Sequence, residues 1–109
     1  ALTLGMKAGL ELPVIIESGS RGIIGSMQDR LAPTVFRGEF EPPAFTLALA
    51  RKDIGLATEL GRENNVPLPV VSLVEQIMME AMNRGWGEKD RTIAMLLQEE
   101  AAGVQMRST

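Results

Sequence analysis

The hydrophobic positions of this chain recur at helical spacing rather than in the alternation of a β-strand. The pattern predicts helices over residues 12–18, 23–35, 44–64, 68–84 and 91–102, and residues 1–9 resemble the last turns of a further helix. The β-branched residues 14–16 are too short and isolated to form a sheet, and no hairpin turn joins two β-rich runs. We therefore expect an all-α fold of five or six helices.

Glycine, proline and small polar residues mark the predicted breaks. Gly9, Gly85 and Gly103 follow apolar runs and predict helix ends, while Asp90 is suited to cap the last helix. Pro33 is expected to end or bend the helix predicted over residues 23–35. Because no capping residue precedes the first helical piece, we expect that the chain has been cut from a longer protein.

The predicted helix over residues 44–64 is apolar over most of its circumference, which predicts a central helix buried on several sides. One stripe of this helix consists of Phe45, Leu49, Leu56 and Leu60. Lys52 lies at the edge of that stripe, and Asp53 projects between its residues. Burying either charge is costly unless it is paired or hydrogen-bonded.

Two interpretations of Lys52 and Asp53 remain open. In the first, Lys52 extends to solvent while Asp53 binds a nearby helix end, and the helix pattern by itself favours this interpretation. In the second, Lys52 faces a cleft and binds an anionic or carbonyl group of a ligand.

Composition excludes several kinds of chemistry. The 109 residues correspond to one domain, and they contain no cysteine and no histidine, so disulfides, thiolate nucleophiles, the usual zinc sites and histidine bases are excluded. A net charge of -3, with no basic patch, gives no reason to expect nucleic acid or an anionic membrane as a partner. No apolar stretch approaches the roughly 20 residues that span a bilayer. We expect a cytoplasmic protein without a metal site.

Residues 40–57 read FEPPAFTLALARKDIGLA, which resembles the signature of the β-hydroxyacid dehydrogenase family. That signature has an aromatic residue, a second Phe (here Phe45), a Lys-Asp pair (here Lys52 and Asp53) and a Leu-Ala pair. Ile54 stands where the family commonly has Leu. Residues 66–69 and 85–90 follow at the family's spacing, and residues 1–10 and 18–20 resemble its helix end and small-residue loop. The resemblance reaches about Gly103 and is strongest to 3-hydroxyisobutyrate dehydrogenase and tartronate semialdehyde (2-hydroxy-3-oxopropionate) reductase.

The resemblance implies a helical bundle like the C-terminal domain of 6-phosphogluconate dehydrogenase, formed by residues 1–109 as one domain. In the family this domain follows an N-terminal Rossmann domain that binds NAD or NADP, closes the active-site cleft over a small β-hydroxy acid, and forms a homodimer or higher homo-oligomer. By this resemblance Lys52 is the cofactor-binding lysine, and Phe45 and Asp53 are supporting candidates.

The sequence also lacks two motifs of the family. Gly19, Gly22 and Gly25 do not form the G-x-G-x-x-G turn of a dinucleotide fold, and no Lys-x-x-Asn-Asn stretch supplies the family's catalytic lysine. Lys7 lies at the wrong end of its helix for that role. We therefore expect no catalytic residue, no bound cofactor and no activity in this chain alone. The alternative is a free-standing helical dimerisation module; a helical DNA-binding domain is disfavoured by the acidity.

Overall fold

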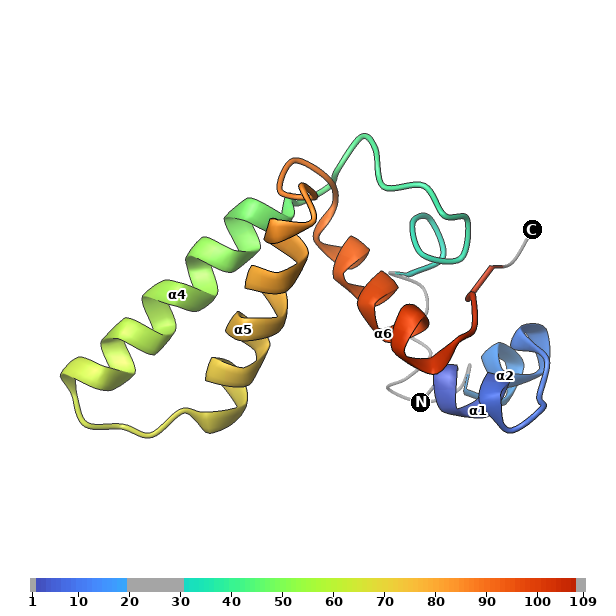
Figure 1. Cartoon of the computed structure of the whole chain (residues 1–109), viewed down its shortest axis with the longest axis horizontal. Helices are drawn as coiled ribbons and strands as arrows, with labels where there is room; N and C mark the ends of the chain where they lie inside the picture. Colours follow the sequence, from blue (N-terminus) through green and yellow to red (C-terminus); the bar gives the residue numbers. More distant parts are fainter. Residues whose placement is uncertain (1, 20–30, 108–109) are drawn as a thin grey trace. The chain divides into compact units, whose positions relative to one another are not determined.

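The computed structural model describes residues 2–19 and 31–107 (Figure 1). Its elements are α1 (Leu2–Lys7), α2 (Leu12–Gly19), α4 (Leu47–Glu63), α5 (Pro69–Asn83), the 3-10 helix η1 (Arg91–Ala94) and α6 (Met95–Ala102). Within the described residues there is no strand, only an isolated bridge between Thr46 and Asp90. The predicted all-α class is therefore confirmed. The chain divides into two compact units, residues 41–94 and the residues on either side of them.

Most of the predicted helix ends are confirmed. Gly85 and Gly103 have φ values of +82° and +71°, a left-handed conformation that glycine adopts without the strain of a Cβ atom. Pro69 begins α5, where a missing N–H costs no helical hydrogen bond. The helix predicted over residues 23–35 lies largely outside the described residues. Its described end forms successive turns over residues 32–38, as expected after Pro33.

Two predicted helix starts differ from the structure. The helix predicted from residue 44 begins at Leu47, since the hydroxyl of Thr46 accepts a hydrogen bond from the N–H of Leu49 (3.3 Å). The helix predicted over residues 91–102 begins as the 3-10 turn η1 and becomes α-helical only at Met95.

The unit of residues 41–94 is built on α4 and α5, which run side by side as a helical hairpin and also contact η1 (Figure 1). Leu47, Ala50, Ala81 and Ile93 form its buried apolar core. A buried glycine lets the chain beyond α4 turn back closely. A Cβ atom on Gly61 would lie only 2.6 Å from Cδ1 of Leu68 and 3.1 Å from the carbonyl oxygen of Val66.

The apolar stripe of α4 is not buried, so the prediction of a central helix buried on several sides is wrong for this chain. The exposed fractions are 37% for Phe45, 49% for Leu49, 56% for Leu56 and 61% for Leu60. At about 100° per residue, the three leucines lie on the side of α4 opposite Leu47. The residues of α4 that are buried are instead Leu47, Ala50, Thr58 and Gly61, most of which are small.

The other unit joins α1 to α2 and to α6. Gly5 lets helices α1 and α2 approach closely because it has no side chain. A Cβ atom at this position would lie only 2.7 Å from Cδ1 of Ile15. Its buried apolar side chains are Leu12, Val35, Phe36, Phe40 and Met106. That residues 1–109 form one domain stays a prediction.

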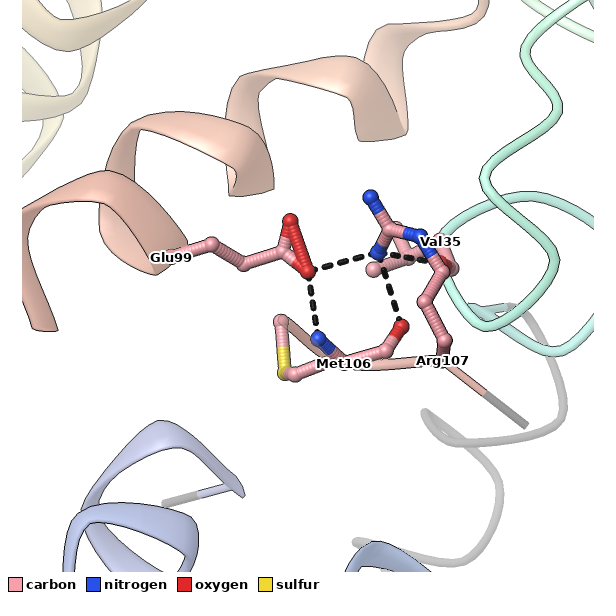
Figure 2. Close-up of polar contacts among 4 residues, drawn as sticks. All are labelled: Val35, Glu99, Met106 and Arg107. Carbon is pink, nitrogen blue, oxygen red and sulfur yellow. Dashed lines mark hydrogen bonds and ion pairs between the residues drawn. The ribbon is translucent and has the colours of Figure 1, made fainter. Parts of the chain in front are cut away.

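A buried carboxylate holds the C-terminal segment of this unit. Glu99, which is 4% exposed, accepts hydrogen bonds from the N–H of Met106 (2.6 Å) and from Nη1 of Arg107 (2.7 Å). Figure 2 shows that the same nitrogen also reaches the carbonyl oxygen of Val35, at 3.0 Å. One ion pair therefore connects α6, the C-terminal segment and the turns after residue 31.

Candidate functional site

The start of α4 is held by a segment that lies far along the chain. The N–H groups of Leu47 and Ala48 donate to the carbonyl oxygens of Lys89 and Gly87, both at 2.9 Å, and Thr46 caps Leu49. The N–H groups at a helix start otherwise attract anions. Because they are already paired, this helix end is not a phosphate site.

Asp90 fixes the residues immediately before α4. Its Oδ1 accepts hydrogen bonds from the N–H groups of Ala44 (3.0 Å) and Phe45 (3.3 Å), and its Oδ2 accepts from the N–H of Thr92 (3.0 Å) and from the hydroxyl of the same residue. Burial by itself raises the pKa of this carboxyl group, but the hydrogen bonds from Thr92, Phe45 and Ala44 together lower the pKa below its ordinary value. Asp90 is thus held as a carboxylate, and its role as a cap of the last helix is confirmed.

Phe45, a supporting candidate, lies in the segment that Asp90 holds. Its carbonyl oxygen accepts a hydrogen bond from the N–H of Arg91 at 2.8 Å. The guanidinium carbon of Arg91 lies 5.7 Å from the centre of the Phe45 ring, within the range of a cation–π contact. The structure therefore places a positive charge on an exposed aromatic ring.

Lys52 lies on the exposed surface of α4 and lines a shallow groove of about 320 Å³. The lining side chains come from α4 and from one residue of α5: Arg51, Lys52, Leu56, Thr58, Glu59, Arg62 and Glu75, with Gly55 between them. The hydroxyl of Thr58 lies 3.0 Å from the carbonyl oxygen of Gly55 and 3.3 Å from Oε1 of Glu75, and its single proton is donated to one of these two acceptors or shared between them. Three cations and two carboxylates thus share one groove, which leaves a net positive charge.

The sequence-predicted site residues are not gathered in one cavity. Asp53 is exposed, so neither it nor Lys52 carries the burial penalty expected from the sequence. The groove's lining includes neither Phe45 nor Asp53. Arg91 and Glu75 were not among the predicted site residues, because their contacts with α4 depend on chain segments that are distant in sequence.

A larger hollow of about 450 Å³ lies in the other unit, between α6 and the C-terminal segment. Two of its three charged side chains, Glu99 and Arg107, are already bonded to each other, and the third is Glu100. This pair is therefore not available to bind a ligand in the hollow. Within the described residues, no helix combines the length and the apolar character that crossing a membrane requires.

Comparison with known proteins identifies related sequences. The chain is 33% identical over 108 residues to 2-(hydroxymethyl)glutarate dehydrogenase of Eubacterium barkeri, a match over 97% of this chain and 36% of that protein. It is 31% identical over 90 residues to glyoxylate/succinic semialdehyde reductase 1 of Arabidopsis thaliana, covering 82% of this chain and 31% of that protein. An uncharacterised oxidoreductase of Shewanella frigidimarina is 34% identical over 80 residues, 72% of this chain and 27% of that protein. The chain thus spans about a third of the length of these curated relatives.

A family model matches almost the whole chain, over residues 1–97. Its description is NAD-binding of NADP-dependent 3-hydroxyisobutyrate dehydrogenase. The three relatives are likewise named as a dehydrogenase, a reductase and an oxidoreductase. The chain belongs to this family of NAD-binding, 3-hydroxyisobutyrate dehydrogenase-like sequences.

Proposed function

We propose that this chain is the C-terminal, cleft-closing helical domain of an NAD(P)-dependent oxidoreductase that acts on a small β-hydroxy acid. The observation that carries the proposal is the family match over residues 1–97, together with an exposed lysine in the groove along α4. The names of two relatives, 2-(hydroxymethyl)glutarate dehydrogenase and glyoxylate/succinic semialdehyde reductase 1, support a small organic acid or its aldehyde as the substrate.

Lys52 is the proposed cofactor-side residue. The groove that it lines carries Arg51 and Arg62 as further cations, and such a donor set fits an anionic dinucleotide. When bound, a nicotinamide dinucleotide supplies the hydride chemistry. The ammonium group of Lys52 would donate a charge-assisted hydrogen bond to an anionic or carbonyl oxygen of the cofactor or substrate and so orient it. Asp53, exposed on α4, and Phe45, in the segment just before α4, would support this position.

Exposed apolar residues on α4 and α5 support a second part of the proposal, association with other protein surfaces. Leu56 and Leu60 on α4 and Val70, Leu73 and Ile77 on α5 are between 42% and 71% exposed. Side chains of this kind gain about 25 cal/mol for each Å² removed from water. We propose that they contact the N-terminal Rossmann domain and a second copy of the enzyme.

The proposal is tested with the full-length protein that contains this sequence and with the 109-residue chain alone. Each is assayed with 3-hydroxyisobutyrate and 2-hydroxy-3-oxopropionate, and with NAD and NADP in both oxidation states. We expect turnover by the full-length protein and none by the chain alone. A full-length protein with no activity toward either acid would contradict the proposal and favour the alternative, a helical dimerisation module without catalytic activity.

A further inference from the structure

We propose that Arg91 is a specificity-determining residue that binds a second carboxylate on the substrate, so that the enzyme prefers β-hydroxy dicarboxylates. This inference rests on the proposed function and extends it to a substrate class. The observation behind it is the position of the Arg91 guanidinium over Phe45, the aromatic residue that the family resemblance makes a supporting candidate.

The position of Arg91 is fixed from two directions. Its backbone N–H is bonded to the carbonyl oxygen of Phe45 at 2.8 Å, while the preceding residue, Asp90, holds the N–H groups of Phe45 and Ala44. Its guanidinium carbon lies 5.7 Å from the ring centre of Phe45. A cation held on an aromatic face loses less side-chain freedom when it binds a ligand than a cation extended into solvent.

The charge of Arg91 is not used by the rest of the described structure. Arg91 is exposed, and it takes part in neither of the ion pairs found among the described residues, Lys89 with Glu41 and Arg107 with Glu99. The adjacent carboxylate of Asp90 is occupied by the backbone and by Thr92. The guanidinium therefore retains a planar set of N–H donors that matches the two oxygens of a carboxylate.

Arg91 and Lys52 are suited to bind two separate groups of one substrate. Lys52 lies five positions after Leu47, the first residue of α4, which corresponds to about 7–8 Å along the helix. Lys52 is assigned to the cofactor side, whereas Arg91 lies at the beginning of α4. A carboxylate bound by Arg91 must accordingly be several bonds away from the carbon that exchanges hydride, as in a dicarboxylate.

The test uses the full-length enzyme and two β-hydroxy acids of equal backbone length, 2-(hydroxymethyl)succinate and 2-(hydroxymethyl)butanoate. They differ only in a terminal carboxylate or methyl group. For Arg91→Gln we expect KM for the dicarboxylate to rise about 10-fold or more, the loss expected for a charged hydrogen bond. KM for the monocarboxylate should change less than about two-fold, and Arg91→Lys should recover part of the dicarboxylate affinity because it restores the charge.

Arg84→Gln is the matched control. Arg84 lies over the ring of Trp86 at 5.5 Å, so the same change removes an equivalent cation–π contact away from Phe45. Equal effects of Arg91→Gln on the two acids, or no effect on either, would overturn the inference while leaving the proposed function intact. If the wild-type enzyme oxidises neither acid but acts on 3-hydroxyisobutyrate or 2-hydroxy-3-oxopropionate, the inference is overturned and the proposed function stands. Inactivity toward all four acids contradicts the proposed function, and the inference fails with it.

Discussion

The carboxylate of Asp90 accepts a hydrogen bond from the N–H of Ala44 at 3.0 Å, although 46 residues separate the two in the chain. This bond and its neighbours fix the beginning of α4. For Asp90→Ala we expect a loss of about 2–3 kcal/mol in the free energy of unfolding, because several partly buried N–H groups lose a charged acceptor. Urea unfolding measures this free energy. A change below about 0.5 kcal/mol, the usual effect of a surface substitution, would contradict the role of Asp90 in fixing the beginning of α4.

The same carboxylate predicts a pH dependence. The pKa of Asp90 is lower in the folded protein than its ordinary value, so the unfolded chain binds the proton more readily. The stabilisation is therefore complete above about pH 4 and is lost as the pH falls through the lowered folded-state pKa. Asp90→Asn, which keeps an oxygen acceptor but cannot ionise, should flatten this part of the stability profile. An unchanged acid profile in that variant would contradict the assignment.

The ion pair of Glu99 and Arg107 predicts that truncating either side chain destabilises the protein. Glu99→Ala removes the acceptor for both the Met106 N–H and the Arg107 guanidinium, whereas Arg107→Ala leaves the carboxylate with the Met106 N–H. We expect each change to destabilise the protein by about 2 kcal/mol or more. Glu99→Ala leaves the buried N–H of Met106 without its acceptor, and Arg107→Ala leaves the buried carboxylate of Glu99 without its cation. In a double-mutant cycle, the two losses should not add. Additive losses would mean that the pair does not interact.

Two glycines of α4 provide a matched pair for testing the packing of the hairpin. Gly61→Ala should destabilise the protein by about 1–3 kcal/mol, because the new Cβ meets Leu68 and the backbone oxygen of Val66. Gly55→Ala should be nearly neutral or stabilising. Its Cβ would meet only the far ends of flexible side chains, the carboxylate of Glu75 at 3.0 Å and Nη1 of Arg51 at 3.9 Å, and alanine favours the helix by about 1 kcal/mol. Thermal unfolding compares the two variants, and equal destabilisation would contradict this account of the turn after α4.

The exposed apolar residues of α4 predict self-association of this chain. Leu60, which is 61% exposed, would be partly covered in such a contact. We expect Leu60→Glu to raise the dissociation constant at least about ten-fold, because a charge would be desolvated at the interface. Leu4→Glu, at a residue 73% exposed in the other unit, is the matched control. Sedimentation measures both variants, and a wild-type chain that stays monomeric at high concentration would contradict the prediction.

Local features of the sequence predicted the helices well. The spacing of apolar residues and the positions of Gly85, Asp90 and Gly103 located the helix ends, because each acts on neighbouring residues. The pattern failed where the partner is distant. Asp90 holds the N–H groups of Ala44 and Phe45, just before α4, although these residues lie 46 and 45 positions away in the chain, and no local pattern reveals such contacts.

The candidate site was predictable only in part. The Lys-Asp pair marked Lys52 as a residue out of place in an apolar helix, and the structure puts it in a groove with other cations. The prediction that the apolar stripe beside Lys52 is buried was wrong. An apolar pattern indicates which residues favour contact with another surface, but it does not indicate whether this chain contains that surface. Arg91 was recognised only as the start of a helix, because its contact with Phe45 requires the folded chain.

Replacement of Lys52 by alanine in the full-length enzyme tests the central claim most directly. We expect an unchanged fold by circular dichroism and a fall in kcat/KM of about 10- to 100-fold, the loss expected for a charged hydrogen bond to cofactor or substrate. Lys7→Ala, a change of the same kind on α1, should leave kcat/KM at the wild-type value. Wild-type kinetics in Lys52→Ala would contradict the assignment of Lys52 to the cofactor side.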